Sequence, residues 1–228
     1  MHRFADAELV IFDCDGVVVD SELLATGVLR DALAALGVRL TLEEVVDRFL
    51  GRSPETIARN LWRDFQVVYD EAAQEAARAR LFDLFRTGLK PIAGVSSLLR
   101  ALRTPYCLAS SSEMDRIELA LQATGLDGFF AGRIYSATMV ARGKPEPDLF
   151  LHAASAMGAT PARCIVVEDS PAGIEAAQRA GMAAIGFTGG AHARTARHRA
   201  ALLQLRPAML VNTMDELAIA LGPTTVAD

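Results

Sequence analysis

The chain has 228 residues, of which 51% are hydrophobic, so it can bury a sizeable core and is not mainly disordered. Its net charge of −5 and the lack of a block rich in lysine or arginine argue against nucleic-acid binding. No apolar run approaches the ~20 residues of a membrane span, and Asp6 and Glu8 stand where a signal peptide would be apolar. We therefore expect a cytoplasmic protein without nucleic-acid or membrane partners.

Neither the cysteines nor the histidines are spaced like the ligands of a metal site. The three cysteines lie in or beside apolar runs and lack CxxC spacing, which indicates reduced, buried thiols. Cys14 stands between two aspartates, where a small core residue is a simpler interpretation than a redox group. Surface positions are the default for the four histidines, which are His2, His152, His192 and His198.

The first structural signal is an uninterrupted apolar run from Leu9 to Phe12, which continues into Asp13 and Asp15 before Gly16. A short apolar run that ends at a turn signal predicts a buried strand of a parallel sheet. Side chains two positions apart in an extended chain share a face, so the two aspartates should stand side by side. They would lie at the carboxyl end of the strand, where open α/β sheets bind ligands. Because two close carboxylates repel each other, a bound cation would stabilise them.

Residues 22 to 87 carry helix signals alone. After an amphipathic pattern over about 22–36, Thr41 and Glu44 form a capping box for a second helix that ends near residue 50. Pro54 opens a third helix at its first position, and a fourth is expected over about 70–86. We therefore predict an inserted, all-helical cap domain over residues 21–88.

From residue 91 onward, strand and helix signals alternate, which predicts a Rossmann-like parallel sheet with helices on both faces. Residues 1–20 and 89–228 would then form one Rossmann-like core that the insert interrupts. The expected strands are 106–109, 133–135, 164–168, 183–187 and 209–211, and the expected helices are 96–102, 114–124, 148–157, 172–180 and 214–221.

Three further polar clusters each follow a predicted strand. Ser110, Ser111 and Ser112 precede a helix and could bind an anion or act as competing N-caps. Lys144 is held between Gly143 and two prolines, although most lysines are solvated. Glu168–Asp169 ends an apolar strand, where adjacent acids need a cation or hydrogen bonds. Because parallel strands end at one edge of the sheet, all these clusters and the first aspartates should converge there.

In order and content, the four clusters resemble the four signatures of the haloacid-dehalogenase-like superfamily along essentially the full chain. They read DCDGVVVDS at 13–21, the serine at 110, KPEPD at 144–148 and VVEDSPAG at 166–173. The branch they resemble contains sugar-phosphate phosphatases and β-phosphoglucomutase-like enzymes. Within it, the chain looks most similar to bacterial phosphatases that act on hexose 6-phosphates or phosphogluconate.

This resemblance implies a Mg²⁺-dependent phosphomonoesterase with an aspartyl-phosphate intermediate. Asp13 would be the nucleophile and a Mg²⁺ ligand. Asp15 would protonate the leaving oxygen and later activate water, while its backbone carbonyl contacts the metal. Asp169, with Glu168 beside it, would complete the metal site.

The resemblance also implies how substrate is held. Ser110, with Ser111 beside it, would bind phosphoryl oxygens, and Lys144 would neutralise the charge of the phosphoryl group. In the cap, Arg52 is the best candidate for contacting the sugar, with a solvated arginine at the start of a helix as the alternative. We expect Trp62 in the cap core and not as a platform for the sugar. We expect a monomer.

Three other functions have to be weighed. Mutases of this branch carry a histidine where this chain has Ala25 and a basic residue where it has Pro54, so both positions favour a phosphatase. Dehalogenases lack the second acid, which Asp15 supplies here. A receiver-type phospho-acceptor module also combines acids with a lysine, but it is about half as long and has no helical insert.

Overall fold

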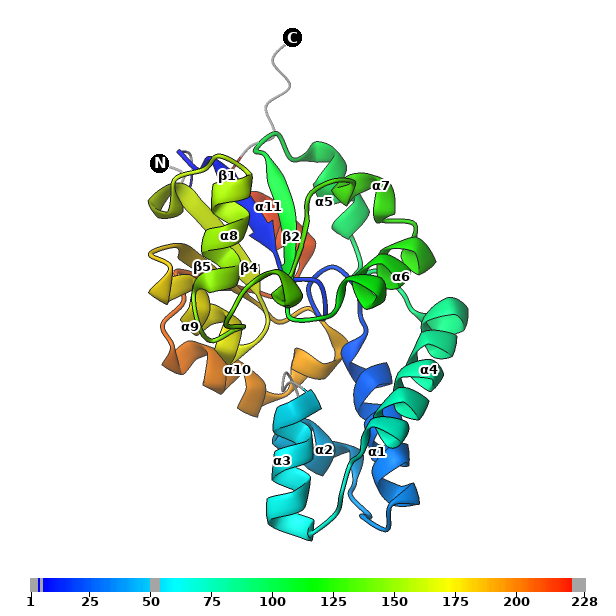
Figure 1. Cartoon of the computed structure of the whole chain (residues 1–228). Helices are drawn as coiled ribbons and strands as arrows, with labels where there is room; N and C mark the ends of the chain where they lie inside the picture. Colours follow the sequence, from blue (N-terminus) through cyan, green and yellow to red (C-terminus); the bar gives the residue numbers. More distant parts are fainter. Residues whose placement is uncertain (1–3, 5, 50–53, 223–228) are drawn as a thin grey trace.

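The computed structural model describes residues 4, 6–49 and 54–222, and within them one six-stranded parallel sheet has the order β3-β2-β1-β4-β5-β6. The strands are β1 (Leu9–Phe12), β2 (Tyr106–Ser110), β3 (Ile134–Ser136), β4 (Cys164–Glu168), β5 (Ala183–Phe187) and β6 (Met209–Val211). Each neighbouring pair runs parallel, so the predicted Rossmann-like sheet is confirmed (Figure 1). Strands β2 and β3 lie on one side of β1, and β4, β5 and β6 lie on the other. β1 is therefore an inner strand, between β2 and β4.

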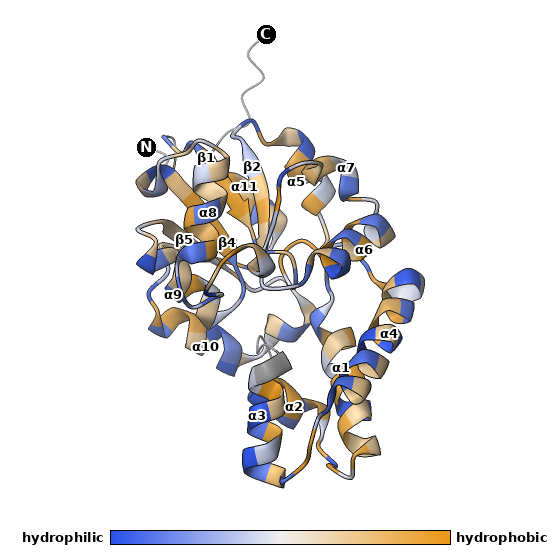
Figure 2. Cartoon of the chain, viewed as in Figure 1, coloured by the Kyte–Doolittle hydropathy of each residue, from blue (hydrophilic) through white to orange (hydrophobic). Residues whose placement is uncertain are grey.

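Apolar layers cover both faces of the sheet, because successive side chains of a strand point to opposite faces. Val10 and Phe12 belong to one buried cluster, whereas Leu9 and Ile11 belong to the other. Helices α5 (Val95–Ala101), α6 (Met114–Thr124) and α11 (Met214–Leu221) contribute to the first layer. Helices α8 (Asp148–Ala156), α9 (Pro171–Arg179) and α10 (Ala196–Gln204) contribute to the second. Figure 2 shows the matching pattern, with hydrophobic strands inside and hydrophilic residues on the outer faces of the helices.

Two helices were not predicted. The short α7 (Asp127–Phe130) follows α6, and α10 follows a 3-10 turn, η3 (Ala191–Arg194). The α10 sequence, Ala-Arg-His-Arg-Ala-Ala-Leu-Leu-Gln, has its apolar residues next to one another near its end, and Leu202 is its one buried residue. Its hydrophobic periodicity is therefore too weak to indicate a helix. The two remaining 3-10 turns are η1 (Ala137–Met139) and η2 (Pro161–Arg163).

The predicted helical insert is present as α1 (Glu22–Ala35), α2 (Leu42–Phe49), α3 (Pro54–Phe65) and α4 (Glu71–Gly88). Figure 1 shows these helices as a group below the sheet. A buried cluster of their own includes Leu33, Val45 and Leu61. Helices α1 and α4 also reach the first layer of the sheet, through Val28 of α1 and Phe85 of α4. The expected capping box begins α2, since the Thr41 N–H donates to Glu44 at 2.8 Å and the Glu44 N–H donates to the Thr41 hydroxyl at 3.2 Å.

The expectation that Trp62 lies in the core of the insert is wrong. The residue is 55% exposed, because the neighbouring Leu61 takes the inward position on α3.

Ion pairs join the insert to the sheet domain on two sides. Arg78 of α4 pairs with Asp115 of α6, and Arg197 of α10 pairs with Asp47 of α2. No helix in the described part of the chain is long and apolar enough to cross a membrane.

Candidate active site

Asp13 lies immediately after the central strand and is buried. The register pairs Phe12 with Leu108 of β2 and with Val167 of β4, so Asp13 is level with Glu168. The loop that precedes α8 brings Lys144 into the same place. Its Nζ donates to Asp13 Oδ1 at 2.5 Å and to Glu168 Oε1 at 2.6 Å. Polar residues from three distant parts of the chain therefore meet at the carboxyl edge of the sheet, as the sequence predicts.

Lys144 is not a solvated lysine, because its side chain is 4% exposed. A third hydrogen bond, to the carbonyl oxygen of Ala109 at 3.2 Å, completes its donor capacity. Burial lowers the pKa of Lys144, but Asp13 and Glu168 outweigh this effect and raise the pKa well above its ordinary value. The ammonium group stays charged and supplies a fixed positive charge beside Asp13.

Asp15 is held by three donors. The hydroxyls of Ser21 and Ser112 donate to it at 2.5 and 2.7 Å, and Arg116 Nη2 donates at 2.8 Å. Burial raises the pKa of Asp15, but Arg116 and the hydroxyl donors bring it below its ordinary value. Asp15 is therefore ionised in this arrangement. Arg116 was missed from the sequence, although its place on the first turn of α6, directly after the serine cluster, points to the same edge.

The serine cluster occupies the end of β2. Ser110 is buried and its hydroxyl accepts the backbone N–H of Ser112 at 3.1 Å, while Ser111 is exposed. None of the serines caps α6, because Glu113 is its N-cap residue and makes no side-chain capping bond. The competing N-cap interpretation is therefore wrong, and the turn presents hydroxyls and backbone N–H groups next to Asp15.

The two acids after β4 have different surroundings. Glu168 is engaged at both oxygens, since Oε1 accepts from Lys144 and Oε2 accepts from the N–H and hydroxyl of Ser170, each at 2.8 Å. Gly173 makes this possible, because a Cβ there would collide with the Glu168 carboxylate. Asp169 instead points toward the loop after β1, where a Cβ on Gly16 would collide with its carboxylate.

A divalent cation fits the charge of this site. Burial and the nearby acids raise the pKa values of both Asp13 and Asp169 well above the ordinary range, even though Lys144 opposes the rise. Three buried acids, Asp13, Glu168 and Asp169, thus face one lysine. Among the described residues, no three Asp, Glu, His or Cys side chains already form a complete metal-binding group. Mg²⁺ suits such a site, since it takes one or two carboxylates and completes its shell with water and phosphate oxygens.

The carboxylates of Asp13 and Asp169 are the candidates for holding that ion. The Asp15 carboxylate is occupied by its three donors, which leaves its backbone carbonyl as the available metal ligand. Both oxygens of Glu168 are likewise occupied, which favours a supporting place for Glu168 beside the metal ligands.

Comparison with known proteins identifies the family. A model of the haloacid dehalogenase-like hydrolases matches residues 7–181. The chain belongs to this family. It is therefore a hydrolase. The predicted membership of the superfamily and the predicted enzymatic activity are both confirmed.

Its curated relatives include phosphatases of phosphorylated sugars. The chain is 31% identical over 192 residues to a 6-phosphogluconate phosphatase of Escherichia coli K12, which covers 84% of this chain and 87% of that protein. It is 32% identical over 182 residues to a fructose-1-phosphate phosphatase of the same organism, covering 77% and 94%. Among solved structures, a haloacid dehalogenase-like protein of unknown function from Agrobacterium tumefaciens has a TM-score of 0.83 at 36% identity, covering 93% and 96%.

The hydrolase also places two histidines near its catalytic edge, where surface positions were expected. The side chain of His192, from η3, is 1% exposed and its Nε2 lies 2.9 Å from Asp169 Oδ2. His198, from α10, contacts the backbone carbonyl oxygen of Asp169 through Nε2 at 2.7 Å. Burial lowers the pKa of both imidazoles, which favours their neutral forms. The prediction was wrong for His192, which is buried, whereas His198 is half-buried. Their partner is distant in the sequence, so ligand spacing along the chain does not reveal it.

Glu22 is a further residue that the sequence did not indicate. It lies half-buried on the first turn of α1, where the insert leaves the sheet domain. Burial, together with repulsion from Asp15 and Asp169, raises the pKa of Glu22 to about 7. This carboxyl therefore changes its charge near neutral pH within the catalytic edge.

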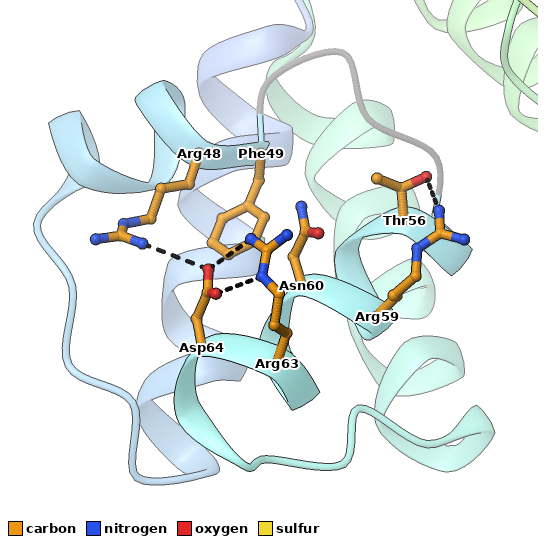
Figure 3. A pocket seen from close by; sticks show the side chains of 7 residues that line it. All are labelled: Arg48, Phe49, Thr56, Arg59, Asn60, Arg63 and Asp64. Atoms are coloured by element: carbon orange, nitrogen blue, oxygen red, sulfur yellow. Dashed lines mark hydrogen bonds and ion pairs between the residues drawn. The ribbon is translucent and has the colours of Figure 1, made fainter.

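The insert carries a separate concavity of about 380 Å³ between α2 and α3 (Figure 3). Arg48 and Arg63 both pair with Asp64 there, and Arg59 donates to the Thr56 hydroxyl. None of the residues that line it comes from the four catalytic clusters; they are Arg48, Phe49, Thr56, Arg59, Asn60, Arg63 and Asp64. The concavity is therefore separate from the candidate active site. Arg52, the predicted sugar contact, lies outside the described residues.

Proposed function

We propose that this hydrolase is a Mg²⁺-dependent phosphatase that cleaves a small sugar phosphate through an aspartyl-phosphate on Asp13. The observation that carries the proposal is the buried contact of Lys144 with Asp13 and Glu168, next to the separately held Asp15. It supplies a carboxylate nucleophile, a fixed positive charge and a second acid at one edge of the sheet. Relatives named as phosphatases of 6-phosphogluconate and fructose 1-phosphate support the substrate class.

In the first half of the reaction, an Asp13 carboxylate oxygen attacks the phosphorus atom. The bond between phosphorus and the sugar oxygen breaks, and the sugar oxygen takes a proton from Asp15. In the second half, water attacks the phosphorus atom and gives its proton to Asp15. The bond to Asp13 then breaks, which releases inorganic phosphate and restores the ionised Asp13.

Asp15 has to exist in both protonation states. Arg116 and the two hydroxyls favour its ionised form in the resting protein, as the base role requires. A phosphoryl dianion that enters beside Asp15 raises its pKa through repulsion, and this favours the protonated form before the sugar leaves. The same side chain then serves as acid and as base, which is how general acid–base groups with a tuned pKa work.

The remaining residues neutralise and orient the phosphoryl group, which are the main tasks in catalysis of phosphoryl transfer. Lys144 balances the charge on Asp13 and on the phosphoryl oxygens. Ser110 and Ser111 offer hydroxyls and backbone N–H groups at the turn before α6. Asp13, Asp169 and the Asp15 carbonyl would hold Mg²⁺, which would supply positive charge to the same oxygens.

We further propose that α1–α4 act as a cap that closes over this edge and selects the leaving group, with Arg52 as the candidate sugar contact. A closed cap would exclude bulk water and unsuitable substrates. Ala25 and Pro54 favour hydrolysis over phosphoryl transfer back to a sugar, because mutases resembling this chain carry a histidine and a basic residue there.

The test is phosphate release with Mg²⁺ from a panel of sugar phosphates, including 6-phosphogluconate, fructose 1-phosphate and β-glucose 1-phosphate. Free phosphate from several of them, and none after chelation, supports the proposal. Conversion of β-glucose 1-phosphate to glucose 6-phosphate without net phosphate release would instead identify a mutase. Turnover that persists at full rate in the presence of chelator contradicts the metal dependence.

A further inference from the structure

Asp169 is held from two sides by a pair of histidines that the four catalytic clusters do not include. His192 Nε2 lies 2.9 Å from the carboxylate oxygen Oδ2, and His198 Nε2 lies 2.7 Å from the backbone carbonyl oxygen. The two imidazole rings pack edge to face, with centroids 5.2 Å apart and an interplanar angle of 84°. The carboxylate and the backbone carbonyl of Asp169 are thus each contacted by one of two histidines whose rings pack against each other.

The His192 ring lies in a slot that admits little movement. A Cβ on Gly16 would lie 2.7 Å from His192 Cε1, and a Cβ on Gly190 would lie 2.9 Å from the same atom. Real Cβ atoms do not approach so closely, so both glycines are needed for the imidazole to fit. The Ala191 N–H also donates to Asp20 Oδ1 at 3.0 Å, which ties η3 to the segment after β1. These contacts fix the orientation of the ring before any ligand arrives.

The contact with Asp169 is specific to one ring nitrogen. Nδ1 of His192 is buried and has no hydrogen-bond partner in the part of the chain that is described, whereas Nε2 faces the carboxylate. A neutral imidazole in this slot satisfies its surroundings best with its proton on Nε2, where the acceptor lies. Asp169 needs such a donor, because Asp15 and Glu168 both repel its charge.

We propose that His192 is a positioning residue, which donates from Nε2 to Oδ2 of Asp169 and so directs the other carboxylate oxygen toward the metal. The inference rests on the proposed function, since it takes Asp169 as a Mg²⁺ ligand. Side chains that orient metal ligands typically change metal affinity 10–100-fold when they are removed. The His198 side chain contacts the backbone carbonyl oxygen of Asp169 and so supports the same residue.

The test is Mg²⁺ binding to the resting protein, measured directly by titration calorimetry without substrate. His192→Leu fills the slot but removes the donor, and we expect it to weaken Mg²⁺ binding by roughly 10–100-fold. His192→Gln restores an N–H group at the ε position and should bind Mg²⁺ within a few-fold of the wild type. His152→Leu is the matched control, because His152 is an exposed histidine on α8 that packs edge-on against Tyr135, and its affinity should not change.

His192→Asn covers the case in which the leucine variant fails to fold. Its amide fits the slot but stops short of Asp169, so the same loss of affinity is expected. Wild-type affinity in a folded leucine or asparagine variant overturns the positioning role and leaves the proposed function standing. A wild-type protein that hydrolyses sugar phosphates but binds no Mg²⁺ overturns both this inference and the metal site on which it rests.

Discussion

Replacing Lys144 by methionine should destabilise the protein strongly, because it leaves two buried carboxylates without their shared cation. The lysine side chain is 4% exposed and its Nζ lies 2.5 Å from Asp13 and 2.6 Å from Glu168. Removing one partner of a buried ion pair costs about 3–5 kcal/mol. For a chain of this length, each kcal/mol lowers Tm by about 2–4 °C, so we expect a fall of roughly 6–20 °C.

The matched control is Arg142→Met in the same loop. Arg142 is 61% exposed and pairs with Asp148, and exposed pairs contribute about 0.2–1 kcal/mol. Its Tm should therefore fall by less than about 4 °C. Thermal unfolding of both metal-free variants, followed by circular dichroism at pH 7 and pH 5, measures the difference.

The pH dependence identifies the cause. Without Lys144, which opposes the rise, the pKa of Asp13 in the folded state moves further above its unfolded value. A raised carboxyl pKa means that stability is retained at low pH and lost as pH rises. The gap between Lys144→Met and the wild type should therefore narrow from pH 7 to pH 5. Equal losses in the two variants, or a gap that widens at pH 5, would refute the reasoning.

Three further outcomes are expected. Asp13→Asn should abolish phosphate release, and measurable turnover would contradict the nucleophile assignment. The Tm of the metal-free variant should equal or exceed that of the wild type, because the substitution removes a buried acid whose pKa is raised. Asp15→Asn should keep Mg²⁺ affinity yet stall turnover, as calorimetry and steady-state assays can establish together. The metal-free wild type should lose up to about 3 kcal/mol of stability between pH 4.5 and pH 7 through Glu22, because its folded-state pKa is raised. Glu22→Gln should lack that slope, and an unchanged slope in denaturant titrations rules Glu22 out.

The sheet and the convergence of the catalytic clusters follow from local patterns. Apolar runs that end in acids or serines predict strands and their carboxyl ends, and parallel strands end at one edge. This was sufficient to bring together Asp13, Lys144 and Glu168, whose contacts span more than half of the chain. The helical insert could likewise be predicted, because its capping signals are local.

The residues that were missed depend on tertiary contacts. Arg116 and His192 have ordinary local sequence contexts, and only the fold places them against Asp15 and Asp169. The apolar residues of helix α10 lack a clear helical period, although the helix brings His198 to the same edge. Trp62 was expected in the core of the insert, whereas its position on α3 faces outward. Partners distant in the sequence leave no periodic signal.

The most direct test of the proposed mechanism is to trap the phosphorylated enzyme. Asp15→Asn, incubated with Mg²⁺ and p-nitrophenyl phosphate, can still be phosphorylated because this leaving group needs no proton. It cannot activate water efficiently, so the phosphoryl group should accumulate. Mass spectrometry after acid quenching should locate one phosphoryl group on the peptide that contains Asp13, and none in the double variant with Asp13→Asn. A phosphoryl group elsewhere, or its accumulation without Asp13, would contradict the account.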